Sequence, residues 1–120
     1  MTVDLYLGDC LEVMKSMPDK SVDAVITDPP YGIRLANHGA FNGDFSVIGD
    51  NDISSANAIS EWAEKNKIGI AMFCSPDIQF SGKWNSRLVW HKPGRGLGGD
   101  WERCWLRDWE MILVHAVKPI

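Results

Sequence analysis

The sequence predicts an α/β fold that contains a pair of parallel strands. Residues 22–27 form an apolar, β-branched run that ends at an aspartate followed by two prolines, which is typical of a buried strand with a rigid turn after it. Residues 3–8 alternate in part and predict an earlier strand, and residues 10–17 carry apolar side chains at the spacing of a short helix. A strand, a helix and a strand in this order favour a parallel pair with a right-handed crossover.

The composition indicates one domain, residues 1–120, with 45% hydrophobic residues to fill a core. No apolar run approaches the length of a membrane span and the first residues lack signal-peptide character, so we expect a cytoplasmic protein with no membrane partner. The chain has an odd number of cysteines, and none of them has Cys-x-x-Cys spacing: Cys10, Cys74 and Cys104. This pattern predicts reduced thiols and no metal site. The net charge of −4 argues against an independent DNA binder.

Residues 32–53 are rich in Gly, Asn and Asp and predict a long loop, either functional or a surface loop. Ser54 or Ser55 is expected to cap a helix that runs to about Lys67, and residues 68–74 read as another buried strand. Only about a dozen residues separate that strand from the next, which is short for a crossover helix, so we expect an irregular connection.

The C-terminal third predicts two further strands, over residues 87–91 and 111–117. Between them, Trp101, Trp105 and Trp109 recur every fourth residue, which favours a helix with an aromatic stripe for core or interface packing.

The turn that follows residues 22–27 carries groups able to hold a planar amine. Asp28 can accept two hydrogen bonds from an amino group, and the Pro29 carbonyl can accept another in a direction set by the rigid ring pair. Tyr31 can stack on a flat heterocycle. In an open α/β sheet, ligands bind outside the carboxyl ends of the strands, where this turn would lie. Acceptors on an exocyclic amine favour the tetrahedral geometry with which its nitrogen attacks a methyl group.

The motif Asp28-Pro29-Pro30-Tyr31 resembles the catalytic motif of S-adenosylmethionine-dependent amino-methyltransferases, which methylate adenine N6 or cytosine N4 in DNA. Residues 5–14 and 17–23 before it, and residues 88–93 and 109–115 after it, resemble the permuted type, in which the catalytic motif precedes the cofactor motif. Taken alone, the four residues could equally be a chance strand followed by a Pro-Pro turn. The flanking similarity touches most of the chain and makes the resemblance more specific.

The resemblance implies roles for individual residues. Asp28 and Pro29 would hold the target amine within a catalytic motif completed by Pro30 and Tyr31, and Tyr31 would stack on an extruded base. Asp9 and Asp28 would help to hold S-adenosylmethionine. Asp9 is also the natural N-cap of the helix that follows it, and one residue can serve both purposes.

Residues 94–99 spell Gly-x-Gly-x-x-Gly, which we reject as a dinucleotide-binding fingerprint. Lys92 and a proline separate it from the preceding strand, and no acidic residue follows about twenty positions later. The segment predicts a flexible loop, or a substrate-facing loop in which Lys92 and Arg95 contact DNA phosphates.

The family fold implies a partial Rossmann-like sheet, mostly parallel, with an antiparallel hairpin at its C-terminal edge, where His91 and His115 could lie close together. The chain ends before the family's recognition region and its aromatic-Gly-x-Gly cofactor motif, so only the catalytic-motif part is present. In the family, two strands from that later part lie between residues 3–8 and the strand before Asp28. We therefore expect a homo-oligomer or a complementing subunit.

Two functions from different classes follow. The first is a DNA amino-methyltransferase, or its catalytic-motif half, that methylates adenine N6 or cytosine N4. The alternative is an inactive methyltransferase remnant that binds nucleic acid or a protein partner, which the missing cofactor motif and the acidic balance favour. A third possibility is a related amino-methyltransferase that acts on RNA or protein.

Overall fold

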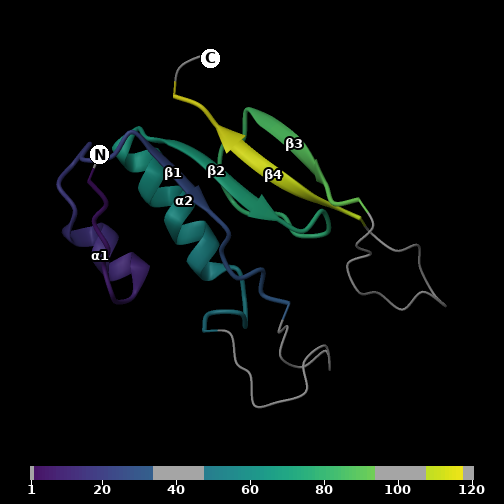
Figure 1. Cartoon of the computed structure of the whole chain (residues 1–120), viewed down its shortest axis with the longest axis horizontal. Helices are drawn as coiled ribbons and strands as arrows, with labels where there is room; N and C mark the ends of the chain where they lie inside the picture. Colours follow the sequence, from purple (N-terminus) through teal and green to yellow (C-terminus); the bar gives the residue numbers. More distant parts are fainter. Residues whose placement is uncertain (1, 34–47, 94–107, 118–120) are drawn as a thin grey trace.

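A computed structural model describes residues 2–33, 48–93 and 108–117 of the chain. The described residues form an α/β structure with one four-stranded sheet in the order β1-β2-β4-β3 (Figure 1). The strands are Ala24–Thr27 (β1), Gly69–Cys74 (β2), Ser86–His91 (β3) and Trp109–His115 (β4), and the helices are Cys10–Ser16 (α1) and Ser54–Asn66 (α2). Neither helix has the length and hydrophobicity that crossing a bilayer would require.

The sheet is mixed, which corrects the prediction of a mostly parallel, Rossmann-like sheet. One pair, β1 and β2, is parallel, whereas β4 lies between β2 and β3 and runs antiparallel to both. The predicted antiparallel pairing of the last two strands is confirmed. The connection from β2 to β3 contains no helix, as its length predicted, and it crosses the sheet as an irregular segment.

The strand predicted over residues 3–8 is absent, because these residues pair with no strand among the described residues and are exposed. The parallel pair is built instead from β1 and β2, with α2 between them in the chain. The helix after residues 3–8 was predicted correctly, as α1. Asp9 caps it, and its Oδ1 accepts hydrogen bonds from the backbone N–H groups of Leu11 (2.8 Å) and Glu12 (3.3 Å).

The core lies between α2 and one face of the sheet. Small and branched residues of α2 meet alternate residues of β2 and β4 there, and Phe80 from the β2–β3 connection closes the cluster. The fully or nearly buried members are Ala56, Ile59, Ala63, Ile70, Met72, Cys74, Phe80 and Leu113. The predicted serine cap of α2 is wrong, because the carboxylate of Asp52 accepts the N–H of Ser54 at 2.8 Å.

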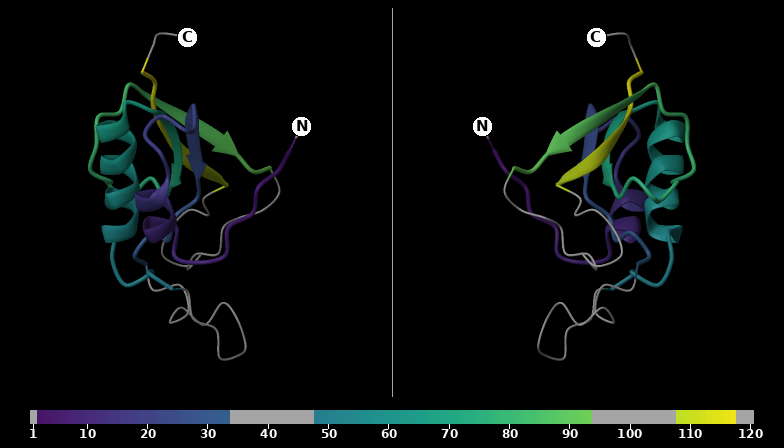
Figure 2. Two further views of the ribbon diagram at one scale, coloured as in Figure 1. Left: turned by 90° about the vertical axis from the view of Figure 1, so that its left-hand side faces the viewer. Right: turned by 90° about the vertical axis from the view of Figure 1, so that its right-hand side faces the viewer.

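The opposite face of the sheet has no helix over it among the described residues, and Figure 2 shows α2 on one side only. Strand alternation and register place Ile26, Phe73, Leu88 and Trp90 on this face. The rings of Phe73 and Trp90 pack edge to face, with their centroids 5.5 Å apart. Ile26, on the same face, is 78% exposed.

Two further expectations about the C-terminal strands are corrected. His91 pairs with Trp109 and His115 pairs with Ile70, so the two histidines lie at opposite ends of β4. Trp109 begins β4 and does not belong to a helix. The other two tryptophans of the predicted stripe lie outside the described residues, as do residues 34–47 of the predicted loop and the glycine-rich residues 94–99.

Candidate functional site

The turn after β1 opens into a hollow of about 260 Å³ at the carboxyl end of the parallel pair. β1 ends at Thr27 because two prolines follow Asp28 and cannot continue the ladder. Asp28 is exposed to solvent and Pro29 is buried, so the turn is held from beneath while its carboxylate faces outward. The hollow is lined by Asp28, Pro29, Pro30, Tyr31, Ile33, Asp50 and Glu110. The structure thus brings together the four motif residues in one place.

Tyr31 orients the Asp28 carboxylate. Its hydroxyl donates a hydrogen bond to Oδ1 of Asp28 at 2.7 Å, and its ring packs against Phe80 with centroids 6.4 Å apart. Burial, followed by the hydrogen bond to Asp28, raises the pKa of Tyr31 above its ordinary value of 10, so the phenol stays protonated as a donor. The ring is half-buried in this arrangement. Stacking on a base remains a prediction for this residue.

A buried carboxylate, Asp50, secures the end of the turn. It is 5% exposed, and one oxygen, Oδ1, accepts the backbone N–H groups of Gly32 at 2.9 Å and Ile33 at 3.2 Å. Gly32 has φ of +71°, and a Cβ built there would lie 2.7 Å from the carbonyl carbon of Asp52. The turn therefore needs glycine at this position. Sequence reasoning missed Asp50, because an aspartate eighteen residues after Gly32 carries no local signal.

Glu110, which lines the hollow, belongs to an ion pair. Glu110, from β4, accepts from the Lys92 ammonium at 2.5 Å, and the two side chains are only 16% and 20% exposed. The same ammonium lies 4.2 Å from the centroid of the Trp90 ring. Lys92 was predicted to contact DNA phosphates, but here its charge is engaged by Glu110. Arg95, the other predicted phosphate contact, lies outside the described residues.

Asp9, predicted to contact the cofactor, is not among the residues that line the hollow. Its exposed carboxylate caps α1, which confirms the structural reading of this residue. Across the described residues, no cluster of histidine, cysteine or acidic side chains could hold a metal ion.

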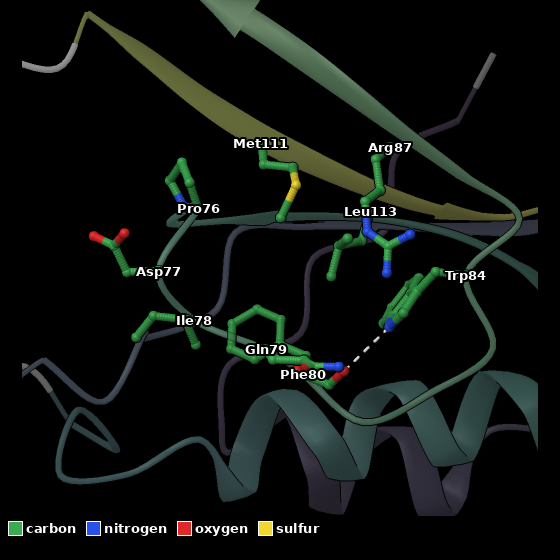
Figure 3. A pocket seen from close by; sticks show the side chains of 9 residues that line it. All are labelled: Pro76, Asp77, Ile78, Gln79, Phe80, Trp84, Arg87, Met111 and Leu113. Carbon is green, nitrogen blue, oxygen red and sulfur yellow. Dashed lines mark hydrogen bonds between the residues drawn. The ribbon is translucent and has the colours of Figure 1, made fainter.

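A second hollow, of about 320 Å³, lies beneath the β2–β3 connection (Figure 3). Met111 and Leu113 border it on the strand side and Phe80 on the helix side, while Arg87 and Trp84 stand at one end. The Trp84 indole donates to the Phe80 carbonyl at 3.2 Å. Because Phe80 also packs against Tyr31, it separates this hollow from the Asp28 turn.

The acceptors at the turn favour a donor-bearing ligand. One oxygen of Asp28 accepts the hydrogen bond from Tyr31. The other two carboxylates of the hollow are engaged elsewhere: Asp50 accepts backbone amides, and Glu110 pairs with Lys92. The Asp28 carboxylate therefore has a set orientation and a second oxygen to offer to a bound amine. Fold and site together define an α/β protein with an acceptor-lined hollow at a strand end.

Comparisons with known proteins give one indication of what kind of α/β protein this is. No family model matches the chain. A stretch of 29 residues, 24% of the chain, is 52% identical to the type II methyltransferase M.BamHI of Bacillus amyloliquefaciens, and it spans 7% of that protein's length. This short match supports a methyltransferase-like protein.

Proposed function

We propose that this chain is the catalytic-motif part of an S-adenosylmethionine-dependent DNA amino-methyltransferase. The observation that carries the proposal is the Asp28–Tyr31 turn, which presents an oriented carboxylate and a hydrogen-bonded phenol at the carboxyl end of β1. The 29-residue likeness to a type II methyltransferase supports the same reading. DNA is the proposed partner, with adenine N6 or cytosine N4 as the methylated atom.

The proposed mechanism uses acceptors rather than a covalent intermediate. The oxygen of Asp28 that does not bind Tyr31 accepts one hydrogen of the exocyclic amine, and the Pro29 carbonyl accepts the other. With both hydrogens held, the nitrogen becomes tetrahedral and its lone pair is directed at the methyl donor. Asp50 keeps these acceptors in place by binding the N–H groups at the end of the turn. S-adenosylmethionine, when bound, would supply the methyl group from a positively charged sulfur, which would leave as a neutral thioether, and the methylated nitrogen would lose one of its protons to solvent.

The residues of the turn fit the positive charge of the cofactor, because the exposed Asp28 carboxylate attracts a sulfonium or ammonium group. Asp28 would hold it, with Asp9 as the further residue proposed from the resemblance. The hollow of about 260 Å³ lies below the usual range of small-molecule pockets, roughly 300–1,000 Å³. It accommodates a single planar base better than a base together with a cofactor, so the cofactor would need residues beyond those that line the hollow.

A binding module without catalysis is the second candidate. The sheet face over which the described residues place no helix carries exposed Ile26, Leu88 and Trp90, which favours a protein partner for such a module. Lys92, one of the two cations expected to contact DNA, is paired with Glu110 in the structure, and its contact with DNA stays a prediction.

The test combines calorimetric titration with S-adenosylmethionine and methyl transfer to unmethylated DNA, using the wild-type chain, Asp28→Ala and Asp23→Ala. Asp23 is an exposed carboxylate just before β1 and serves as the matched control. We expect Asp28→Ala to reduce methyl transfer by at least about a hundredfold, as loss of a transition-state contact does, while Asp23→Ala retains it. Equal transfer by wild type and Asp28→Ala would refute the mechanism, and binding without transfer would favour the binding module.

A further inference from the structure

One basic side chain that lines the second hollow lacks an acidic partner. Four basic residues lie between residues 83 and 92. Three of them, Lys83, His91 and Lys92, each lie within ion-pair distance of a carboxylate. The fourth, Arg87, is exposed and forms no ion pair with any residue of the described ranges. Its charge can therefore be met by an anion from outside the chain.

The fold directs Arg87 into the space under the β2–β3 connection. Arg87 belongs to β3 and pairs with Leu113, whose side chain is part of the core on the α2 side of the sheet. With Trp84, it lines the second hollow and also a neighbouring hollow of about 450 Å³. Figure 3 shows Arg87 next to Trp84 at one end of the second hollow and Asp77 at the opposite end. An anion in this hollow would therefore lie at the Arg87 end, away from the Asp77 carboxylate.

The side chains beside Arg87 offer an apolar space of limited size. Phe80, on the helix side, faces Met111 and Leu113, on the strand side. Phe80 and Leu113 are buried, and the Trp84 indole is held by its hydrogen bond to the Phe80 carbonyl. Aromatic rings and a methionine sulfur pack favourably against a further aromatic ring. The volume of about 320 Å³ lies at the lower end of the range of small-molecule pockets, roughly 300–1,000 Å³, which suits a ligand with a single ring.

We propose that the second hollow binds a small aryl carboxylate. The carboxylate would accept two parallel hydrogen bonds from the planar Arg87 guanidinium, and the ring would pack between Phe80 and Met111. Nucleic acid suits this hollow less well, because one unpaired cation beside apolar side chains matches a single negative charge on a compact apolar body. Phe80 separates the second hollow from the Asp28 turn, so this inference does not depend on the proposed enzymatic function.

Calorimetric titration with phenylacetate tests the proposal. Phenylacetamide keeps the shape of this probe without its charge, and acetate keeps the charge without the ring. Arg87→Gln removes the cation, and Lys65→Gln is the matched control, because Lys65 is an exposed cation of α2 that lines neither hollow. We expect wild type and Lys65→Gln to bind phenylacetate alike, and Arg87→Gln to bind it at least about tenfold more weakly. The two matched compounds should bind the wild type more weakly than phenylacetate by a similar factor. Both substituted residues are exposed, so circular dichroism should show an unchanged fold.

Nuclear magnetic resonance of isotope-labelled methionine methyl groups locates the bound probe. The Met111 resonance, assigned with Met111→Leu, should shift on addition of phenylacetate, whereas that of Met14 on α1 should not. No binding to the wild type up to about 10 mM phenylacetate would overturn the proposal. Equal affinities of wild type and Arg87→Gln, equal affinities for phenylacetate and acetate, or binding that leaves the Met111 resonance unchanged would overturn it as well. Binding of inorganic phosphate or a short DNA duplex through Arg87, without binding of phenylacetate, would overturn it in favour of a phosphate contact.

Discussion

Replacing Asp50 should release the turn that carries the proposed catalytic carboxylate. The Asp50 side chain is buried and its Oδ1 accepts the N–H groups of Gly32 and Ile33. Alanine would remove the acceptor and leave both backbone donors without it. Hydrogen bonds to a charged group contribute about 1.5–3 kcal/mol each, so the loss of both bonds in Asp50→Ala is about 3–6 kcal/mol. That is a large share of the stability of an ordinary domain, which is roughly 5–15 kcal/mol.

Asparagine at the same position provides a graded comparison. Its amide oxygen can take the place of Oδ1 and still accept both N–H groups, but it lacks the negative charge. Neutral hydrogen bonds are about half as strong as charge-assisted ones, so Asp50→Asn should cost about half as much, roughly 1.5–3 kcal/mol. Asp19→Asn, in an exposed turn, changes the charge in the same way without a buried acceptor and should have little effect.

Urea denaturation followed by tryptophan fluorescence measures the free energy of unfolding of these variants. Hydrogen exchange of the peptide that contains residues 28–33 measures local opening of the turn. The expected order of destabilisation is Asp50→Ala, then Asp50→Asn, then the exposed control. Equal losses for the alanine and asparagine variants would refute the role assigned to the acceptor oxygen. An alanine variant within about 0.5 kcal/mol of wild type would show that Asp50 does not secure the turn.

Three further predictions concern the same region. Gly32→Ala should destabilise the protein by about 1–3 kcal/mol in urea denaturation, because its φ of +71° and the opposing backbone leave no room for a Cβ; a neutral result would contradict the close approach. Tyr31 should ionise above its ordinary pKa of 10 when the absorbance of a Tyr6→Phe variant, in which it is the sole tyrosine, is followed against pH. Because its pKa is raised in the fold, its contribution to stability is complete below pH 10 and is lost as pH rises further, and a normal titration would argue against the bond to Asp28. Burial raises the pKa of the Cys74 thiol to about 11, so at pH 8 iodoacetamide should modify exposed Cys10 and spare Cys74 until the chain unfolds; peptide mapping would reveal early labelling of Cys74 as the contrary result.

The elements that were predicted correctly are those whose signals are local. Two prolines end β1 wherever the strand lies, and Asp9 caps α1 because its side chain reaches the N–H groups two and three residues ahead. The apolar run of β2 and the end of α2 near Lys67 also follow from neighbouring residues. The strand predicted over residues 3–8 failed for the opposite reason. Its pattern suits a strand, but a strand needs a ladder partner, and none of the described residues supplies one.

In the candidate site, too, local features could be predicted from the sequence and contacts between distant residues could not. The residues alone predict that Asp28, Pro29 and Tyr31 hold a planar amine, because one short rigid turn carries all three, and this role stays a prediction. Only the tertiary structure decided that Asp50 holds the end of that turn and that Lys92 is paired with Glu110. In each case the two partners lie eighteen residues apart, on segments that the folded chain brings together. Backbone stiffness and capping act within a few residues and can be read from a sequence, whereas pairing and burial depend on which distant segments the fold brings into contact.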